Sequence, residues 1–258
     1  MRAAMAVGTA IYGTASSIPH PQAIEQLAKG GIDWLFIDMQ HGLATFSDLP
    51  GLCTMLRSHG VTALVRVPYD DYSVAQRALD AGAEGIIFPY IETAAEARRA
   101  VDACKYPPYG VRSFGPFWSP YGADIEWPNE QVLCFAMIES VTAMGRVDDI
   151  LATPGLDGLF IGPNDLSISM GNGPSMASLY GVTADGQDPA NPALMKGLET
   201  IREAAHRHGK WVGLQLATGA AAASAFNEGF NFVGISGDTS YLADACASEI
   251  ASARKATR

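Results

Sequence analysis

The sequence predicts a closed (β/α)₈ barrel, the TIM-barrel fold, in a single domain spanning residues 1–258. A repeating sequence pattern supports this prediction: a helical segment rich in alanine, a glycine that ends the helix, and an apolar run of strand length. Continuous apolar runs are typical of parallel strands whose outer face is covered by helices. Eight such units in roughly 250 residues are typical of a closed barrel. An open doubly wound sheet is the alternative, but no G-x-G-x-x-G follows the first strand, which favours the barrel.

Eight apolar runs mark the expected strands in chain order. They are residues 9–12, 32–38, 61–67, 84–89, 132–138, 156–162, 210–216 and 230–235. Glycines such as Gly60 and Gly209 stand just before these runs, where a left-handed conformation ends the preceding helix at little cost. Thr93 and Glu96 form a capping-box pattern that opens a helix ending near Lys105.

Two connections are unusually long. They cover residues 106–129 and 171–192, and both are rich in glycine and proline. Loops of this length in a compact domain are usually lids or interfaces. We expect both to follow even-numbered strands and to lie at the catalytic end of the barrel.

Composition and charge exclude several classes of partner. The net charge is −10 and no cluster of Lys and Arg is present, so we expect no nucleic-acid partner. No apolar run approaches the roughly 20 residues of a membrane span. Four scattered cysteines without a C-x-x-C motif indicate reduced thiols and a cytoplasmic protein. The first residues weakly resemble a signal peptide, but residues 9–12 are better used as a strand.

Polar residues at the carboxyl ends of the strands form the candidate site, because chemistry in a TIM barrel takes place at that end. Asp38, Gln40 and His41 follow the second strand, Arg66 ends the third and Glu139 ends the fifth. We expect Asp38, His41 and Arg66 to be catalytic, and Gln40 and Arg66 to bind substrate. The turn after the sixth strand supplies further substrate-binding candidates, which are Gly162, Pro163, Asn164 and Asp165.

Glu139 and Asp165 are expected to be neighbours on adjacent parallel strands, because the interval between them fits one βα repeat. The ends of such strands lie roughly 5 Å apart. Both carboxylates can therefore reach one hard cation such as Mg²⁺ or Mn²⁺. Each acid alone could instead cap a helix or pair with Arg66, and His41 alone could be an ordinary loop histidine. Backbone N–H groups in the turn at residues 162–165 also suit an anionic carboxylate.

The lysines decide between Schiff-base and metal-assisted chemistry. A Schiff-base enzyme needs a lysine inside the mouth of the barrel. Lys29 and Lys105 end helices, and Lys196 lies within one. Lys210 begins a strand at the opposite end of the barrel, and Lys255 is in the tail. Metal-assisted chemistry is therefore the prediction.

Six segments resemble the HpcH/HpaI metal-dependent (class II) pyruvate aldolases, and the resemblance covers nearly the whole chain. Two of them are Asp-Trp-Leu-Phe-Ile-Asp-Met-Gln-His-Gly and Phe-Ile-Gly-Pro-Asn-Asp-Leu-Ser. The six segments are residues 33–42, 65–68, 78–82, 106–112, 138–139 and 160–167. Any one of them would be weak, but together they are specific.

This resemblance implies that Glu139 and Asp165 hold a divalent metal, Mg²⁺ or Mn²⁺, which chelates the carboxylate and keto oxygen of a 2-oxo acid. Arg66 matches the residue that stabilises the enolate, and His41 matches the acid/base. Asn164 and Asp165 would offer backbone N–H groups to the substrate carboxylate.

The resemblance also implies an oligomer. Asp80 matches a carboxylate that acts on the histidine from a neighbouring subunit, although from the residues alone it is a solvated helix end. Such enzymes exchange a C-terminal helix, for which residues 239–256 are the candidate, so we expect a trimer or hexamer. Two residues depart from the family pattern. Gln40 stands where glutamate is common, and Met137 replaces a glutamine and cannot orient a metal-bound water.

The sequence thus predicts a metal-dependent aldolase that cleaves a 4-hydroxy-2-oxo acid to pyruvate or hydroxypyruvate and an aldehyde, with small molecules as its partners. Another metal-enolate enzyme on the same scaffold, a 2-oxo-acid decarboxylase or a CoA-ester lyase, is one alternative. A barrel that binds a metabolite without turning it over is a second, and a purely structural subunit is a third.

Overall fold

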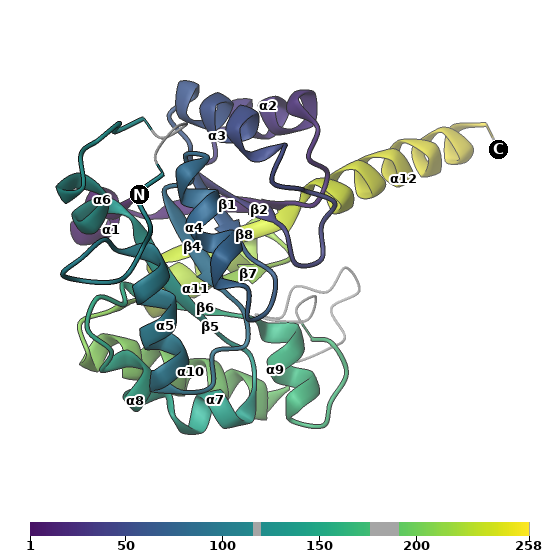
Figure 1. The fold of residues 1–258 in the computed structure, drawn as a ribbon. Coiled ribbons are helices and arrows are strands. Elements are labelled where there is room, and N and C mark those ends of the chain that lie inside the picture. The colour runs from purple at the N-terminus through teal and green to yellow at the C-terminus, as the bar shows by residue number, and fades with distance from the viewer. Residues whose placement is uncertain (116–119, 176–190, 258) are drawn as a thin grey trace.

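Eight parallel strands close into a barrel in the computed structural model, which describes residues 1–115, 120–175 and 191–257 (Figure 1). Each strand pairs with the next one along the chain, and β8 (Phe232–Gly237) returns to pair with β1 (Ile11–Ser16). Helices cover the outside of this sheet. The prediction of a (β/α)₈ TIM barrel is confirmed, and closure between β8 and β1 excludes the open sheet.

The other strands lie within two residues of their expected bounds. They are β2 (Trp34–Asp38), β3 (Thr62–Arg66), β4 (Gly85–Phe88), β5 (Leu133–Ile138), β6 (Gly158–Ile161) and β7 (Trp211–Leu216). The first expected strand, residues 9–12, was wrong in position. The pattern there was misleading because β1 is made largely of small residues. A Cβ on Gly13 would lie 2.2 Å from Cδ2 of Trp34, so this part of β1 has no room for an apolar side chain.

The helices in the described part of the chain mostly follow the strands, as predicted. They are α1 (Arg2–Ala6), α2 (Pro21–Lys29), α3 (Leu49–Ser58), α4 (Tyr72–Asp80), α5 (Ala94–Cys104), α6 (Glu126–Gln131), α7 (Val141–Gly145), α8 (Val147–Leu151), α9 (Pro163–Ser169), α10 (Pro192–Arg207), α11 (Gly219–Glu228) and α12 (Asp238–Ala256). The predicted capping box opens α5: the hydroxyl of Thr93 accepts from the N–H of Glu96 at 3.2 Å, and the Glu96 carboxylate accepts from the N–H of Thr93 at 2.9 Å.

Two hydrophobic clusters hold the barrel together. Aliphatic side chains fill the layer between sheet and helices. Aromatic side chains fill the barrel itself, where the rings of Trp34 and Phe232 lie edge to face with centroids 5.7 Å apart. Strand residues alternate between these two layers. Asp38 therefore points inward with Trp34 and Phe36, and it stands at the carboxyl end of the filled interior.

The first long connection lies at the amino end of the strands, so its expected position at the catalytic end was wrong. It joins the end of α5 to the start of β5, and a segment that leads from a helix into the next strand must lie at that strand's amino end. Lys105 Nζ fixes it there by donating to the carbonyl oxygens of Asn129 at 2.9 Å and Val132 at 2.6 Å. Residues 116–119, and residues 176–190 of the second long connection, lie outside the described residues.

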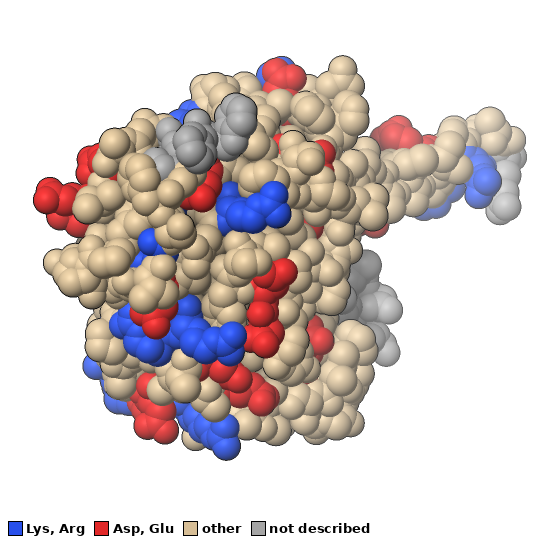
Figure 2. Space-filling model, in the orientation of Figure 1, with Lys and Arg blue, Asp and Glu red and all other residues tan. Residues whose placement is uncertain are grey.

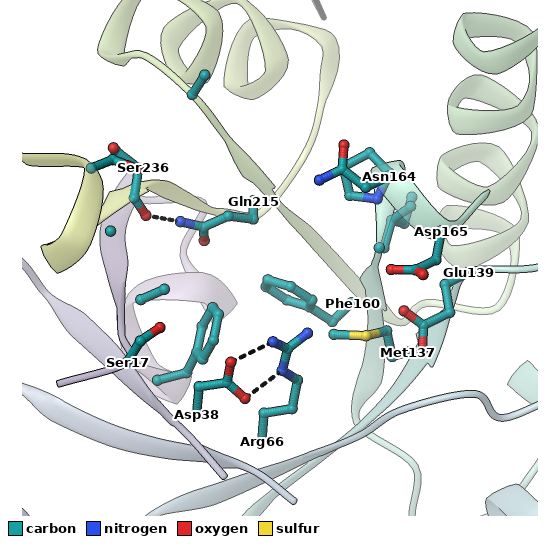
Figure 3. Close-up of a pocket in the computed structure, with 18 of the residues that line it drawn as sticks. Ser17, Asp38, Arg66, Met137, Glu139, Phe160, Asn164, Asp165, Gln215 and Ser236 are labelled. Atoms are coloured by element: carbon teal, nitrogen blue, oxygen red, sulfur yellow. Dashed lines mark hydrogen bonds and ion pairs between the residues drawn. The ribbon is translucent and has the colours of Figure 1, made fainter. Parts of the chain in front are cut away.

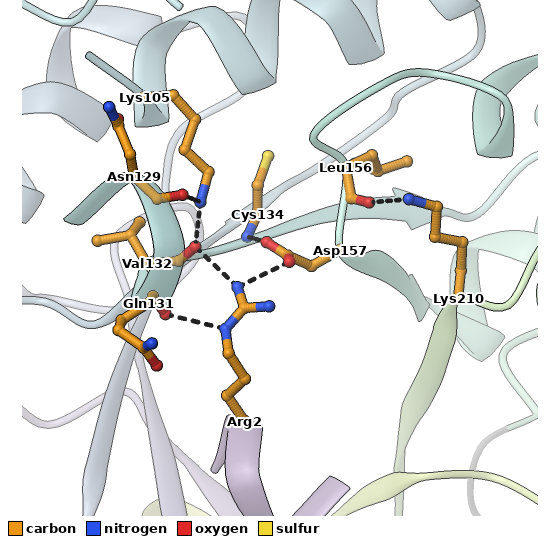
Figure 4. A network of polar contacts seen from close by, with 9 residues as sticks. All are labelled: Arg2, Lys105, Asn129, Gln131, Val132, Cys134, Leu156, Asp157 and Lys210. Atoms are coloured by element: carbon orange, nitrogen blue, oxygen red, sulfur yellow. Dashed lines mark hydrogen bonds and ion pairs between the residues drawn. The ribbon is translucent and has the colours of Figure 1, made fainter. Parts of the chain in front are cut away.

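A polar network ties the same end of the barrel together (Figure 4). Arg2 in α1 donates to the Asp157 carboxylate at 2.7 Å and to the Val132 carbonyl at 3.2 Å. Asp157 in turn accepts from the N–H of Cys134 at 2.8 Å. Lys210 donates to the Leu156 carbonyl at 2.6 Å, so it lies away from the carboxyl ends of the strands, as expected.

All four cysteines are free, and only Cys246 is exposed. Among the described residues, no helix has the length and apolar character needed to cross a bilayer.

Candidate active site

A cavity of about 410 Å³ opens at the carboxyl ends of the strands (Figure 3). This volume lies in the range of small-molecule sites, roughly 300–1,000 Å³. Glu139, Asn164 and Asp165 form one wall, and Asp38 and Arg66 lie at its base. The opposite wall carries Ser17, Gln215 and Ser236. The cavity is therefore polar on two sides and rests on the aromatic interior of the barrel.

Glu139 and Asp165 come together because β5 and β6 are adjacent. Ile138 pairs with Ile161, which places Glu139 beside Gly162 at the top of the next strand. A Cβ on Gly162 would lie 2.5 Å from Oε2 of Glu139, so glycine leaves the space that this carboxylate occupies. Asp165 lies in the first turn of α9 and faces Glu139 across the same corner of the cavity (Figure 3).

The surroundings of Glu139 suit a cation. Its side chain is buried, and Oε1 accepts from the backbone N–H of Tyr90 at 2.8 Å. Burial raises the pKa of Glu139 to about 7; the Tyr90 N–H opposes this shift and the charge of Asp165 adds to it. No ion pair to Glu139 is formed by any described residue. Since a buried carboxylate is costly without a positive partner, this corner fits a divalent metal.

The two acids would supply only part of a metal's ligands. Within the described ranges, no group of three or more His, Cys, Asp or Glu side chains is placed to hold a metal. Mg²⁺ typically binds through one or two carboxylates, with waters and substrate oxygens completing its octahedron. A site of two carboxylates in an open cavity thus leaves positions for a substrate.

Asp38 and Arg66 form the second polar pair, as cross-strand neighbours on β2 and β3. Arg66 donates through Nε and Nη2 to the two oxygens of Asp38, at 2.9 and 2.6 Å. Oδ1 of Asp38 also accepts from the backbone N–H groups of Gln40 and His41, at 3.0 and 3.2 Å. The guanidinium lies over the ring of Phe36, 5.4 Å from its centroid. These contacts fix the direction of Arg66.

The pKa of Asp38 reflects this environment. Burial raises it, but the hydrogen bond and charge of Arg66, together with the backbone donors from Gln40 and His41, outweigh burial and lower the pKa overall. Asp38 therefore stays ionised, with both oxygens occupied. Such a carboxylate is better suited to hold Arg66 in place than to accept a proton.

Asp38→Asn is expected to lower the free energy of unfolding at neutral pH by about 3 kcal/mol, because it leaves Arg66 charged and unpaired in a largely buried position. The folded-state pKa of Asp38 is lowered, so the pair's contribution is complete above the ordinary value of 3.8 and is lost as the pH falls through the folded value. Urea unfolding at several pH values should show the difference between wild type and variant shrinking below pH 3.8.

Asp102→Asn is the matched control, since Asp102 pairs with Arg98 at 2.6 Å on a more exposed helix surface. Its cost should stay below about 1 kcal/mol. A loss of equal size in the two variants, or one that does not change with pH for Asp38→Asn, would contradict the role given to this pair.

The cavity brings together most, but not all, of the predicted site residues. Asp38, Arg66, Glu139 and the turn at residues 162–165 line it. Gln40 and His41 follow β2 at the same end of the barrel, but they are not among the described lining residues, and His41 is exposed. Their predicted contact with substrate stays a prediction.

Asp80 lies outside the cavity, at the opposite end of the barrel. It ends α4, and because the helices run antiparallel to the strands, it is at the amino end of the barrel. Arg112, whose side chain is fully buried, donates to Asp80 at 2.6 Å. The expectation of a solvated helix end was wrong in this respect: Asp80 is half-buried, and burial raises its pKa against the opposing effect of Arg112. Within one chain, Asp80 does not reach the cavity.

The structure adds residues that the sequence reasoning missed. Met137, noted only as a departure, lines the cavity beside Glu139, and the opposite wall had no candidates. Gln215 on that wall interrupts the apolar strand β7, and this was a usable signal: a polar side chain that points inward near the end of a barrel strand. Ser17 and Ser236 gave no signal, because isolated serines after strands are common in loops.

Comparison with known proteins gives consistent matches. The family model for HpcH/HpaI aldolase/citrate lyase matches residues 16–243. The hydroxypyruvate/pyruvate aldolase of Rhizorhabdus wittichii is 35% identical over 243 residues, which cover 92% of this chain and 91% of that protein. The crystal structure of an HpcH/HpaI aldolase from Desulfitobacterium hafniense superposes with a TM-score of 0.86 at 27% identity, covering 98% and 96% of the two chains.

A more distant structure shares the fold. The citrate lyase beta subunit from M. tuberculosis, complexed with oxaloacetate and magnesium, has a TM-score of 0.56 at 16% identity and covers 89% of this chain and 92% of its own.

Proposed function

The chain belongs to the HpcH/HpaI aldolase/citrate lyase family, and from this premise we propose that its cavity joins and cleaves carbon–carbon bonds with a divalent metal held by Glu139 and Asp165. The protein is an aldolase, a carbon–carbon lyase acting on 4-hydroxy-2-oxo acids. Cleavage gives pyruvate or hydroxypyruvate and an aldehyde, and addition is the reverse. One observation supports the metal site: the buried carboxylate of Glu139 faces Asp165 and forms no ion pair with any described residue.

The metal corner, Arg66 and the turn after β6 each have a part in this chemistry. When bound, a divalent metal supplies Lewis-acid polarisation of the keto group. Arg66 binds Asp38 through Nε and Nη2, and no described residue bonds to Nη1. Nη1 can therefore donate to the oxygen that becomes negative in the enolate. The backbone N–H groups of Asn164 and Asp165, in the first turn of α9, suit the substrate carboxylate.

We assign the proton transfer at the C4 hydroxyl to His41. The imidazole of histidine can both accept and donate a proton, which suits a group that takes and returns one. The Asp38 carboxylate holds the backbone N–H of His41, so the histidine and Arg66 are positioned by one group. Asp80 would support His41 only from a neighbouring copy, because its own chain keeps it at the other end of the barrel.

Metal removal tests the proposal. We expect wild-type protein loaded with Mn²⁺ or Mg²⁺ to add pyruvate or hydroxypyruvate to aldehydes, to lose this activity in EDTA, and to recover it when metal is restored. Direct titration with Mn²⁺, followed by electron paramagnetic resonance, measures binding without relying on turnover. Activity that survives thorough chelation would contradict the metal mechanism, and loss of CO₂ from oxaloacetate without any aldol product would favour the decarboxylase.

The C-terminal helix supports an oligomer. α12 projects away from the barrel (Figure 1), and its apolar side chains are exposed: Leu242 by 62% and Ile250 by 48%. At its base, Tyr241 and Leu242 border an apolar cavity of about 500 Å³ that Leu27 of α2 also lines. Exposed apolar surface of this kind marks an interaction site. We propose that α12 packs against a neighbouring copy in a trimer or hexamer.

Ile250→Asp is expected to weaken that assembly, because it places a charge on the exposed apolar face of α12. Light scattering coupled to size-exclusion chromatography should show a trimer or hexamer for wild type and a smaller species for the variant at the same concentration. Ser252→Asp, a charge at an exposed polar position on the same helix, is the control and should leave the mass unchanged. A monomeric wild type would contradict the proposal.

A further inference from the structure

The wall opposite the two acids is lined with hydroxyl groups. Ser17 follows β1, Ser236 lies in β8, and Thr239 and Ser240 lie in the first turn of α12; all four line the cavity. Figure 3 shows Ser17 and Ser236 on the side of the cavity opposite Glu139 and Asp165. No hydrogen bond joins the side-chain hydroxyls of these four residues to any other described residue. They are therefore available to a ligand at the end of the cavity away from the metal corner.

The backbone at Ser236 has an unusual conformation for a residue other than glycine. Its φ is +51°, in the left-handed region, where glycine is the residue without strain. The Gln215 amide donates to the Ser236 carbonyl, as does the Thr14 hydroxyl at 3.4 Å. A strained conformation persists where its surroundings impose it, and such positions cluster at ligand sites. These contacts hold the backbone of Ser236 in place where the residue lines the cavity.

Charge restricts what this wall can bind. Asp244 of α12 also lines the cavity. Arg66 is the only cationic side chain among the described lining residues, and it is engaged by Asp38. An aldehyde with a carboxylate or sulfonate tail would therefore meet Asp244 without a compensating cation. A plain alkyl aldehyde would displace water from the hydroxyls and leave them unpaired, which is costly.

We infer that the aldehyde partner is a neutral hydroxylated aldehyde, whose hydroxyl groups bind to Ser17, Ser236, Thr239 and Ser240 while its carbonyl faces the metal corner. This inference rests on the proposed function and names the class of its second substrate. In the addition, C3 of the 2-oxo acid loses a proton and bonds to the aldehyde carbon, and the aldehyde oxygen gains a proton. Nothing is oxidised or reduced, and the hydroxyl wall acts only in recognition.

The test compares three aldehydes with pyruvate and Mn²⁺-loaded wild-type protein. We expect kcat/KM to be highest for glyceraldehyde, at least about tenfold lower for propionaldehyde, and lowest for succinic semialdehyde. Deuterium exchange at C3 of pyruvate, measured without aldehyde, reports the first half of the reaction separately. Absence of exchange and of all addition would overturn the proposed function and this inference with it. Exchange without a preference for glyceraldehyde would overturn this inference alone.

The three aldehydes also differ in intrinsic reactivity. Comparing variants with wild type on the same pair of aldehydes corrects for this difference. Ser17→Ala and Ser240→Ala should each lower the ratio of kcat/KM for glyceraldehyde to that for propionaldehyde by about tenfold. A ratio cancels any loss of folding or metal loading that both substrates share. Ser248→Ala, at an exposed position on α12 outside the cavity, is the control. An unchanged ratio in both wall variants would overturn the inference.

The role of Asp244 is tested by a variant and a matched control. Asp244→Asn should raise kcat/KM for succinic semialdehyde about tenfold relative to glyceraldehyde, since its repulsion of an anionic aldehyde is removed. Glu249→Gln removes an exposed acid from the same helix outside the cavity and should not change this ratio. Equal effects of the two changes would show that net charge, rather than this wall, sets the preference.

Discussion

Glu139→Gln is expected to weaken metal binding by at least about 100-fold and to remove aldolase activity. Loss of a group that merely supports a metal ligand already costs about 10- to 100-fold in affinity, and glutamine removes one of two carboxylates here. The fold should persist, because glutamine has nearly the same shape and its amide oxygen can still accept the Tyr90 N–H. Mn²⁺ titration by electron paramagnetic resonance, together with thermal unfolding of the metal-free protein, measures the two effects separately.

Glu92→Gln is the matched control for that change. Glu92 follows the neighbouring strand β4 and accepts from the Ser140 hydroxyl, but it is not among the described residues that line the cavity. It should leave Mn²⁺ affinity within about twofold of wild type, since it removes no ligand. If Glu139→Gln binds Mn²⁺ as tightly as Glu92→Gln does, the metal lies elsewhere and the proposed site is wrong.

Arg66→Lys is expected to reduce kcat by about 100- to 1,000-fold while metal affinity changes little. Lysine keeps the positive charge beside Asp38 but cannot bind both carboxylate oxygens and still direct a donor at the developing enolate. The exchange of pyruvate C3 hydrogens, which depends on enolate formation, should fall in parallel. Steady-state kinetics, exchange rates and Mn²⁺ titration distinguish this loss from a failure to load metal.

Arg98→Lys is the control for replacing an ion-paired arginine outside the cavity. Arg98 also binds an aspartate, Asp102, but on the outer surface of α5. Its kinetics should match wild type. Exchange that continues at the wild-type rate in Arg66→Lys would remove the guanidinium from the proposed mechanism.

The fold followed from the sequence because its signals are local and repeated. Each turn glycine and each apolar run indicates one βα unit. Eight such units in succession are compatible with few folds other than a closed barrel. β1 was misplaced for the opposite reason. Gly13 is small because Trp34, which lies more than twenty residues later, occupies the space beside it, and only the closed barrel brings the two together.

The site was predictable in part for a similar reason. Asp38, Arg66 and Glu139 end strands, so topology alone places them at one edge of the sheet. The residues of the hydroxyl wall come from the end of β1, from β8 and from the start of α12. They are far apart in the sequence, so no local sequence pattern indicates them. The first long connection was put at the wrong end because its composition resembles a lid, although its place between α5 and β5 already assigns it to the amino end.

The polar network of Arg2, Asp157 and Lys105 has a practical consequence for anyone who wishes to redesign this enzyme. It lies at the end of the barrel remote from the cavity, so substitutions around it that raise thermal tolerance should leave the choice of acceptor unchanged. A library confined to the first turn of α12 would then shift acceptor choice on a scaffold that has already been made robust.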